Sequence, residues 1–494
     1  MSFDVDLWPT GDGMIYIVAN TTVGQHAVEN LPFSVVKPFF GSPPPGWSVN
    51  NVTTSWSYGY SQQITISPRV SNPISLNYSI VVMNESIFSL PDGRAYANSV
   101  GVLGLGPPVV NSPNKGNPID GDPTLLEQLK SFGKISSFSF GMHMGSAQHN
   151  QPGSLVLGGY EQNRVLGDIG LFDIDDGGVS HIFLLDVFLD TQVGSSPFNT
   201  SKTVSVYKGI NDNTYAANLT KLLGGTRGSV LVALDPSVAY IYLPPGTCEA
   251  ASQYLPVTWD RSTGLYLWNQ NDPKYASIIK SPAYLGFIFA DRNGSNITIK
   301  VPFQLLNLTL SSPLVDSPTP YFPCKTVSDQ MSTTHWPLGR AFLQAAFYGV
   351  NYEKQITFIA QSPGPDMGTS AVKTIRPNDT TILSDSISLF EKSWLTYWTT
   401  LIPTTGLIPP SPDSERGLST ADTAGVAVGS IFGGLLIIGS ALWFFWRRTR
   451  QTRYIQPPSR QNSDRYASIS GVPIELDASQ DAMDISDPLP HECE

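Results

Sequence analysis

Short apolar runs separated by proline and glycine follow one another along the chain up to residue 361. Residues 14–19, 62–67 and 77–83 are examples, and each run is too short for a helix that buries one face. Runs of this length, bounded by turn residues, are typical of β-strands. Residues 122–133 differ, because their leucines recur on one helical face. The pattern therefore predicts a mostly-β chain with few and short helices.

One turn in this pattern contains an isolated acid. Two apolar runs, 231–234 and 239–243, flank a turn that begins at Asp235. A proline follows Asp235 directly, and a pair of prolines ends the second run. This stretch predicts a strand, a turn and a second strand, with the carboxylate of Asp235 at the bend.

A single long apolar run occurs near the end of the chain. Residues 424–446 are 23 residues without a charge, and a helix of that length rises about 34 Å. A bilayer's hydrocarbon core is about 30 Å thick, so the run predicts one transmembrane helix. Arginines follow it at once, which predicts that the tail at 447–494 is cytoplasmic and the preceding region outside.

Composition supports the β-rich prediction and limits the partners. Only 14% of the 494 residues are charged, while Gly (43) and Pro (40) are frequent, so long amphipathic helices are not expected. The net charge of −11 argues against a nucleic-acid surface. No metal-ligating or nucleophile motif is recognisable in the sequence, so neither a cofactor nor a metal ion is expected. The oligomeric state is left open.

Ten N-x-S/T sequons precede residue 400 and none follows it. Such a distribution predicts a glycosylated region in the secretory pathway or outside the cell. The protein is therefore expected in the plasma membrane or a secretory-pathway membrane, in type I orientation. The sequons begin at Asn20, Asn51, Asn77, Asn84, Asn199, Asn218, Asn293, Asn296, Asn307 and Asn378.

The three cysteines do not form a dense disulfide framework. In an oxidising compartment, Cys248 and Cys324 are expected to pair, leaving Cys493 in the tail. Two free buried thiols are the alternative.

Both flanks of the β-rich region carry weaker signals. The first residues have neither a basic nor an apolar segment, so no signal peptide is visible, and an upstream exon is expected to supply one. Residues 363–423 are interpreted as a juxtamembrane segment and a Pro/Ser/Thr-rich stalk, with a helix over 382–398. The tail at 447–494 is expected to be disordered.

Several segments occur in an order that resembles the pepsin-like aspartic peptidases. A hydrophobic-Gly strand, a helix, two strands ending in a Gly-Gly turn, the Asp235 loop and a terminal Leu-Gly strand follow one another. They lie at 101–106, 122–133, 138–160, 231–248 and 335–361. The resemblance is closest to divergent, membrane-anchored members found in fungi. It implies a mostly-β, bilobal ectodomain with an N-terminal lobe at 1–170 and a C-terminal lobe at 171–362.

The resemblance also implies which residues are catalytic. In this family two aspartates, one from each lobe, share a proton so that one acts as acid and the other as base. The C-terminal lobe offers Asp235, but Pro236, Ser237 and Val238 replace the usual Thr/Ser, Gly and Thr/Ser. No Asp-Thr-Gly or Asp-Ser-Gly occurs anywhere in the chain.

In the N-terminal lobe, Asn20 is placed where the partner of Asp235 belongs, and it lacks a carboxylate. The alternative is that this loop is encoded upstream. Tyr58 is the candidate for the tyrosine of the flap, the hairpin that covers the cleft in this family.

Two functions therefore remain open. One is a catalytically impaired surface protein whose cleft binds a peptide or cell-wall material, or only supports the ectodomain. The other is an active membrane-tethered aspartic endopeptidase whose first catalytic loop lies upstream of this sequence.

Overall fold

The fold is described from a computed structural model. The described residues are 7–10, 15–18, 35–39, 52–54, 57–66, 74–83, 86–97, 100–107, 123–175, 178–198, 200, 203–210, 215–326, 335–385, 389–402 and 474–476. Contacts divide the chain into two units, Met1–Ile402 with Ser470–Glu494, and Pro403–Ile469. The second unit lies outside the described residues.

The predicted mostly-β fold is confirmed, and the helices are short. Helix α2 (Leu125–Ser131) lies where the leucine spacing predicts a helix. Thr124 and Glu127 form a reciprocal capping box at its start, and its leucines are fully buried. The other described α-helices are α3 (Tyr215–Leu222), α4 (Thr247–Ser252), α5 (Pro273–Lys280) and α6 (Arg340–Leu343).

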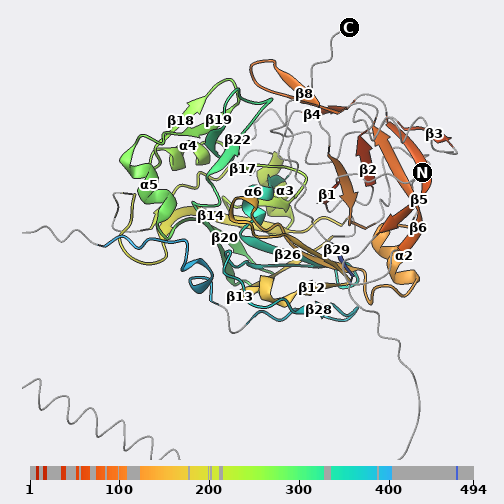
Figure 1. The fold of residues 1–494 in the computed structure, drawn as a ribbon. Coiled ribbons are helices and arrows are strands. Elements are labelled where there is room, and N and C mark those ends of the chain that lie inside the picture. Colours follow the sequence, from red (N-terminus) through yellow and green to blue (C-terminus); the bar gives the residue numbers. More distant parts are fainter. Residues whose placement is uncertain are drawn as a thin grey trace, which may run out of the picture. The chain divides into compact units, whose positions relative to one another are not determined.

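The N-terminal sheet is drawn in red and orange in Figure 1. Its longest pair is the antiparallel hairpin of β5 and β6, which pairs Ser57 with Met83 and Ile66 with Ile74. In the described residues the strand order is β1 (Leu7–Thr10), β9 (Gly101–Gly104), β2 (Ile15–Val18), β6 (Ile74–Met83), β5 (Ser57–Ile66) and β3 (Val35–Phe39).

A central sheet combines strands from both predicted lobes. β10 and β11 are buried along their whole length. β10 pairs with β26, which comes from the end of the C-terminal lobe, so the boundary predicted at residue 170 does not separate two independent sheets. Among the described residues the order is β13 (Leu166–Asp173), β27 (Ile356–Gln361), β26 (Ala346–Asn351), β10 (Ser139–His143), β11 (Ser154–Leu157) and β29 (Ile474–Leu476).

The C-terminal sheet is the largest in the described part of the chain. Its core strands are rich in Val, Leu and Phe, and Phe287 and Phe289 are completely buried. The order is β21 (Asn296–Pro302), β20 (Ala283–Ala290), β14 (Ile182–Thr191), β16 (Val230–Leu234), β25 (Trp336–Leu338), β17 (Ile241–Leu243) and β24 (Cys324–Thr326), with β15 (Val204–Ser205) paired to β14.

Three smaller sheets complete the described strands. One contains β18 (Val257–Asp260), β19 (Leu265–Trp268), β23 (Thr319–Phe322) and β22 (Leu308–Leu310). Another contains β4 (Val52–Thr54), β7 (Ser86–Ser89) and β8 (Ala95–Ala97). The third pairs β12 (Gly159–Glu161) with β28 (Val372–Thr374).

The same strand arrangement occurs once in each half of the chain. In the C-terminal sheet, β25 lies between β16, to which it is parallel, and β17, to which it is antiparallel. In the N-terminal sheet, β9 lies in the same way between β1 and β2. A further parallel strand follows in both, β24 beside β17 and β6 beside β2. The two halves thus share one plan.

Residues 363–402, the first part of the predicted juxtamembrane segment and stalk, pack on the folded body through their described residues, and we call them the C-terminal strap. β28 in the strap pairs with β12, and Thr399 N–H donates to the carbonyl of Lys280 over 2.7 Å. The predicted helix over 382–398 is replaced, in its described part, by a 3₁₀ turn at Lys392–Trp394. Trp394 is only 1% exposed, because its ring packs into the folded body against Gly364.

Other predictions fall outside the described residues. The predicted span at 424–446 is among them, as is almost all of the tail at 447–494. The described helices include none that is long and apolar enough to cross a membrane. Of the sequons, Asn20, Asn51, Asn84 and Asn199 are not described, and Asn77 lies in β6 with its side chain undescribed.

Candidate functional site

Asp235 lies at the crossing of the C-terminal strands. β16 ends at Leu234, and the N–H of Asp235 donates to the carbonyl of Leu338 in β25 over 3.2 Å. The chain then passes from β25 beneath the loop, where Gly339 N–H donates to the carbonyl of Tyr240 over 3.0 Å. A Cβ on Gly339 would lie 2.3 Å from the carbonyl oxygen of Val238, so only glycine fits this crossing.

The carboxylate of Asp235 is held by its own loop. It is 8% exposed, and its Oδ1 accepts hydrogen bonds from Ser237 N–H over 2.9 Å and Ser237 Oγ over 2.6 Å. Val238 has no hydroxyl to donate to this carboxylate. Ser237 supplies a hydroxyl from the preceding position instead, so the acid stays buried and hydrogen-bonded.

Arg340 follows Gly339 and places a cation in the same region. Its Nη1 donates to the carbonyl of Pro236 over 2.8 Å, which ties the first turn of α6 to the Asp235 loop. Burial lowers the pKa of Arg340, while the phenol of Tyr321 and the carboxylate of Asp235 act in the opposite direction. Arginine keeps its proton in proteins, so the loop contains a carboxylate and a fixed positive charge.

Tyrosines and a lysine surround this pair. Lys325 Nζ lies 4.3 Å from the centre of the Tyr240 ring, a cation–π contact. Burial lowers the pKa of Lys325 to about 8. Tyr96 reaches the region from β8 in the N-terminal half, and its pKa, raised by burial, is partly lowered by the charge of Arg340. Tyr96 could not be predicted from the sequence, because an aromatic residue in a short strand such as β8 has no local pattern that marks it as part of a site.

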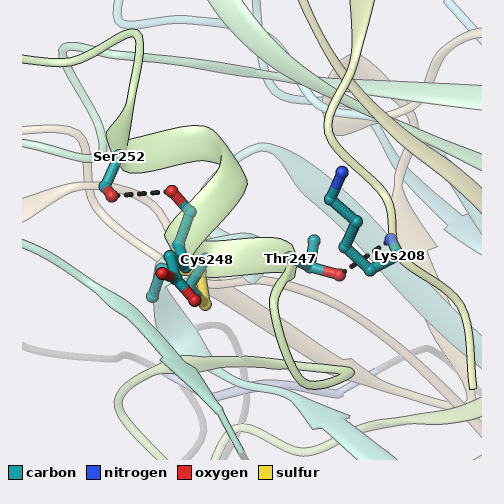
Figure 2. Close-up of a disulfide and its surroundings, with 6 residues drawn as sticks. Lys208, Thr247, Cys248 and Ser252 are labelled. Carbon is teal, nitrogen blue, oxygen red and sulfur yellow. Dashed lines mark hydrogen bonds between the residues drawn. A yellow bond between two sulfur atoms is a disulfide. The ribbon is translucent and has the colours of Figure 1, made fainter.

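A disulfide lies directly after the Asp235 loop (Figure 2). It joins Cys248, in the first turn of α4, to Cys324 in β24, with 5.7 Å between their Cα atoms. The neighbouring Thr247 Oγ1 accepts a hydrogen bond from Lys208 N–H over 3.1 Å. The pair predicted from the sequence is therefore present, and it fixes α4 to the strand beside β17.

Residues 77–214 match the family model of the eukaryotic aspartyl protease. The family model covers this part of the chain, which is therefore similar to the pepsin-like aspartic peptidases. Among solved structures it is similar to the aspartic proteinase from Irpex lacteus, at 15% identity and a TM-score of 0.47, over 72% of this chain and 89% of that chain. No curated protein matches the chain.

The repeated strand plan locates the loop that corresponds to Asp235 in the N-terminal half. Leu338 pairs with both Leu234 and Ile241, and Val102 pairs with both Trp8 and Tyr16. Trp8 therefore corresponds to Leu234, and the residue after it, Pro9, corresponds to Asp235. Pro9 and Thr10 then stand where an aspartic peptidase has Asp and Thr, and Gly11 follows them in the sequence.

The placement of the first loop at Asn20 stays a prediction, whereas the strand pairing favours residues 9 and 10. Asn20 follows the end of β2 and lies outside the described residues, whereas the crossing with β9 involves β1 and the start of β2. The two halves can also be aligned by matching Gly104 in β9 to Gly339 after β25. In that alignment Thr10, rather than Pro9, corresponds to Asp235. Neither Pro9 nor Thr10 has a carboxylate.

The assignment of Tyr58 as the flap tyrosine stays a prediction. Tyr58 lies in β5, which forms a long hairpin with β6, but its side chain is outside the description. Within the described residues no cluster of three His, Cys, Asp or Glu side chains is arranged to hold a metal ion.

A second buried polar cluster lies beneath the central sheet. Arg164 Nε donates to Glu161 over 2.9 Å, and Arg164 Nη1 lies 3.2 Å from His143 Nδ1. His143 Nε2 lies 2.8 Å from the carbonyl of Gln344. Burial, together with the charge of Arg164, lowers the pKa of His143 to about 3. His143 is thus neutral, with Nδ1 accepting and Nε2 donating.

This cluster predicts a loss of stability in acid. Between about pH 6.5 and pH 3 the unfolded chain binds a proton at His143 that the folded chain does not, so stability falls as the pH falls. From pH 7 to pH 4 this histidine should cost about 3 kcal/mol. The free energy of unfolding is measured with urea at pH 7 and at pH 4. Its decrease between the two pH values should be about 3 kcal/mol smaller in His143→Gln than in the parent. An equal loss in both proteins would contradict the assignment.

Proposed function

We propose that this chain is a non-catalytic member of the aspartic peptidase family, whose cleft binds a peptide or cell-wall material without cleaving it. The observation that carries the proposal is Pro9 at the position of the first catalytic acid. Aspartic catalysis needs two carboxylates that share a proton, and they act as one unit. The loop that corresponds to the Asp235 loop supplies Pro9 and no second carboxylate, so it offers no acid to protonate the substrate while Asp235 activates water.

The surroundings of Asp235 support the same proposal. Ser237 donates twice to Oδ1, which occupies one oxygen of the carboxylate. Arg340 stands where the family usually has an aspartate after Leu-Gly, and its guanidinium holds the carbonyl of Pro236. A neighbouring cation stabilises an ionised carboxylate and opposes the protonated form that a shared-proton pair requires. Hydrogen bonds from Ser237 and Arg340 therefore hold the loop in its folded form.

The alternative of an active endopeptidase receives less support. It requires a further Asp-Thr-Gly loop from outside this sequence. That loop would have to take the place in which β1 and β2 already flank β9. We therefore do not propose it.

The proposal is tested by measuring whether the chain binds peptides and whether it cleaves them. A library of extended peptides is incubated with the purified chain between pH 4 and pH 7 and analysed by mass spectrometry. Peptides should be retained by the protein and recovered uncut, and the double variant Arg340→Leu/Lys325→Leu should change which peptides are retained. Recovery of cleaved peptides, with cleavage lost in Asp235→Asn, would contradict the proposal.

We further propose that the chain is a type I membrane glycoprotein with its folded part outside and residues 447–494 cytoplasmic. The uncharged run at 424–446 supports a single span. The disulfide Cys248–Cys324 fits an oxidising compartment. Among the described sequons, Asn218, Asn293, Asn296 and Asn378 are exposed, as glycan acceptors must be.

One pairing in the structure competes with a membrane span. β29, from the tail, pairs with the outer edge of β11. A chain that crosses a bilayer once between residues 424 and 446 places these strands on opposite sides. The proposal therefore requires β29 to be released in the inserted chain. In microsomes, added protease should then remove the tail and leave the glycosylated part protected; protection of both would contradict the orientation.

Glycan mapping tests the outer location separately. Enzymatic deglycosylation followed by mass spectrometry should find occupied sites at Asn218 and Asn378, and at one or both of Asn293 and Asn296. Asn307 should be empty, because it is only half exposed and its Oδ1 accepts a hydrogen bond from Tyr275 over 3.2 Å. A chain without any glycan would contradict the outer location.

A further inference from the structure

Exposed apolar side chains concentrate near the end of the C-terminal strap. In the described part of the chain, ten large apolar side chains are exposed, and four of them lie within residues 389–402. Leu389 is 52% exposed, Leu395 69%, Tyr397 37% and Ile402 85%. Large exposed apolar side chains that gather in one segment mark a contact with another molecule or with a membrane.

A second segment adds to this surface. Val193, in the loop after β14, is 50% exposed. Ser195 N–H donates to the carbonyl of Leu401 over 2.9 Å, so Val193 lies beside the end of the strap. We call Val193, Leu389, Leu395, Tyr397 and Ile402 the apolar rim.

The rim is held in place by the aromatic residues between its members. Trp394 stacks on Trp398 with 5.5 Å between ring centres, and Phe390 meets Trp398 edge-on at 5.7 Å. These rings point into the body, which leaves the neighbouring Leu389 and Leu395 on the outside. The rim therefore belongs to a fixed surface of the folded part.

We infer that the apolar rim rests on the interface of the phospholipid bilayer to which the chain itself is anchored. The inference rests on the membrane span proposed above. Residues 403–423 separate Ile402 from the proposed span, and a fully extended segment of that length reaches about 70 Å at most. The folded part is thus confined near the bilayer, at a high effective concentration.

The chemistry of the rim fits this partner. Leucine, isoleucine and tyrosine are residues that enter the boundary between headgroups and acyl chains. Exposed lysines flank the rim at Lys280, whose carbonyl accepts from Thr399, and at Lys392 in the strap itself. Their charges favour contact with phosphate headgroups.

The test uses the full chain, reconstituted in phosphatidylcholine vesicles that contain a lipid with a quencher on its acyl chain. Cys493→Ser removes the one cysteine outside the disulfide, and Leu395→Cys then carries an environment-sensitive fluorophore. Leu222→Cys, in α3, is the matched control, because Leu222 is 81% exposed and outside the rim. Lipid quenching at residue 395 should exceed that at residue 222 by about threefold or more.

Three other results of this experiment would contradict the inference. Equal quenching at both positions means that the rim does not touch lipid. Quenching at 395 that depends on protein density rather than on the quencher lipid means that a second copy of the chain covers the rim. A chain that alkaline carbonate releases from the vesicles instead contradicts the span itself. The failure of the two proposals is therefore distinguishable.

Discussion

Replacing Trp394 with alanine should lower the free energy of unfolding by about 4 kcal/mol. Its indole is 1% exposed and lies against Gly364, where a Cβ would come within 2.6 Å of the ring. It also stacks on Trp398 and meets Tyr397 edge-on at 6.2 Å. Truncation therefore removes buried apolar area and leaves a cavity that the surrounding backbone cannot fill.

The measurement is urea unfolding of the purified chain in mild detergent, followed by tryptophan fluorescence. Leu395→Ala is the matched control, since Leu395 is the next residue and is 69% exposed. It should change stability by less than about 0.5 kcal/mol. If Trp394→Ala were as mild as the control, residues 389–402 would not be part of the folded body.

Removal of the disulfide should have an effect of similar size. Cys248 and Cys324 are separated by 76 positions, and the loss of a cross-link over a loop of this length costs about 4 kcal/mol in the chain-entropy account. The double variant Cys248→Ala/Cys324→Ala should therefore unfold at a clearly lower urea concentration. The disulfide also fixes α4 against β24, next to the strand that follows the Asp235 loop.

Cys493→Ala provides the control for this prediction, because it removes a cysteine without breaking the cross-link. It should leave the unfolding midpoint unchanged. If the double variant were equally stable, the second half of the chain would not depend on the cross-link.

Local patterns in the sequence predict local structure well here. Residues 122–133 contain their own start signal, since Thr124 and Glu127 cap α2 whatever the rest of the chain does. The run at 101–106 forms β9, and the runs around Asp235 form β16 and β17. In each case the spacing of apolar residues within the segment is enough to predict whether it forms a helix or a strand.

The position of the first loop could not be read in the same way. Pro9-Thr10-Gly11 lacks the acid by which such a loop is recognised. Its identity follows from the pairing of β1 with β9, which is more than 90 residues away in the chain. The Thr10-Gly11 pair is the part of the family motif that the sequence retains. This pair can be recognised as the first loop only once the pairing of β1 with β9 is known.

In the C-terminal strap, the local sequence pattern predicted a structure that does not form. Residues 382–398 have an apolar spacing that fits one helical face, and the nearby prolines and serines favour a stalk. The structure instead buries Trp394 in the body and pairs β28 with β12. Long-range packing overrode a weak local preference, because the body offers a site for a large aromatic ring.

The central claim is that one carboxylate cannot perform aspartic catalysis in this chain. It is tested most directly by assaying the purified glycosylated protein for cleavage of a fluorogenic peptide pool between pH 3 and pH 6, with and without pepstatin, beside the Asp235→Asn variant. We predict that the parent and the variant are equally inactive and that pepstatin changes nothing. Pepstatin-sensitive cleavage by the parent, absent in Asp235→Asn, would contradict the account.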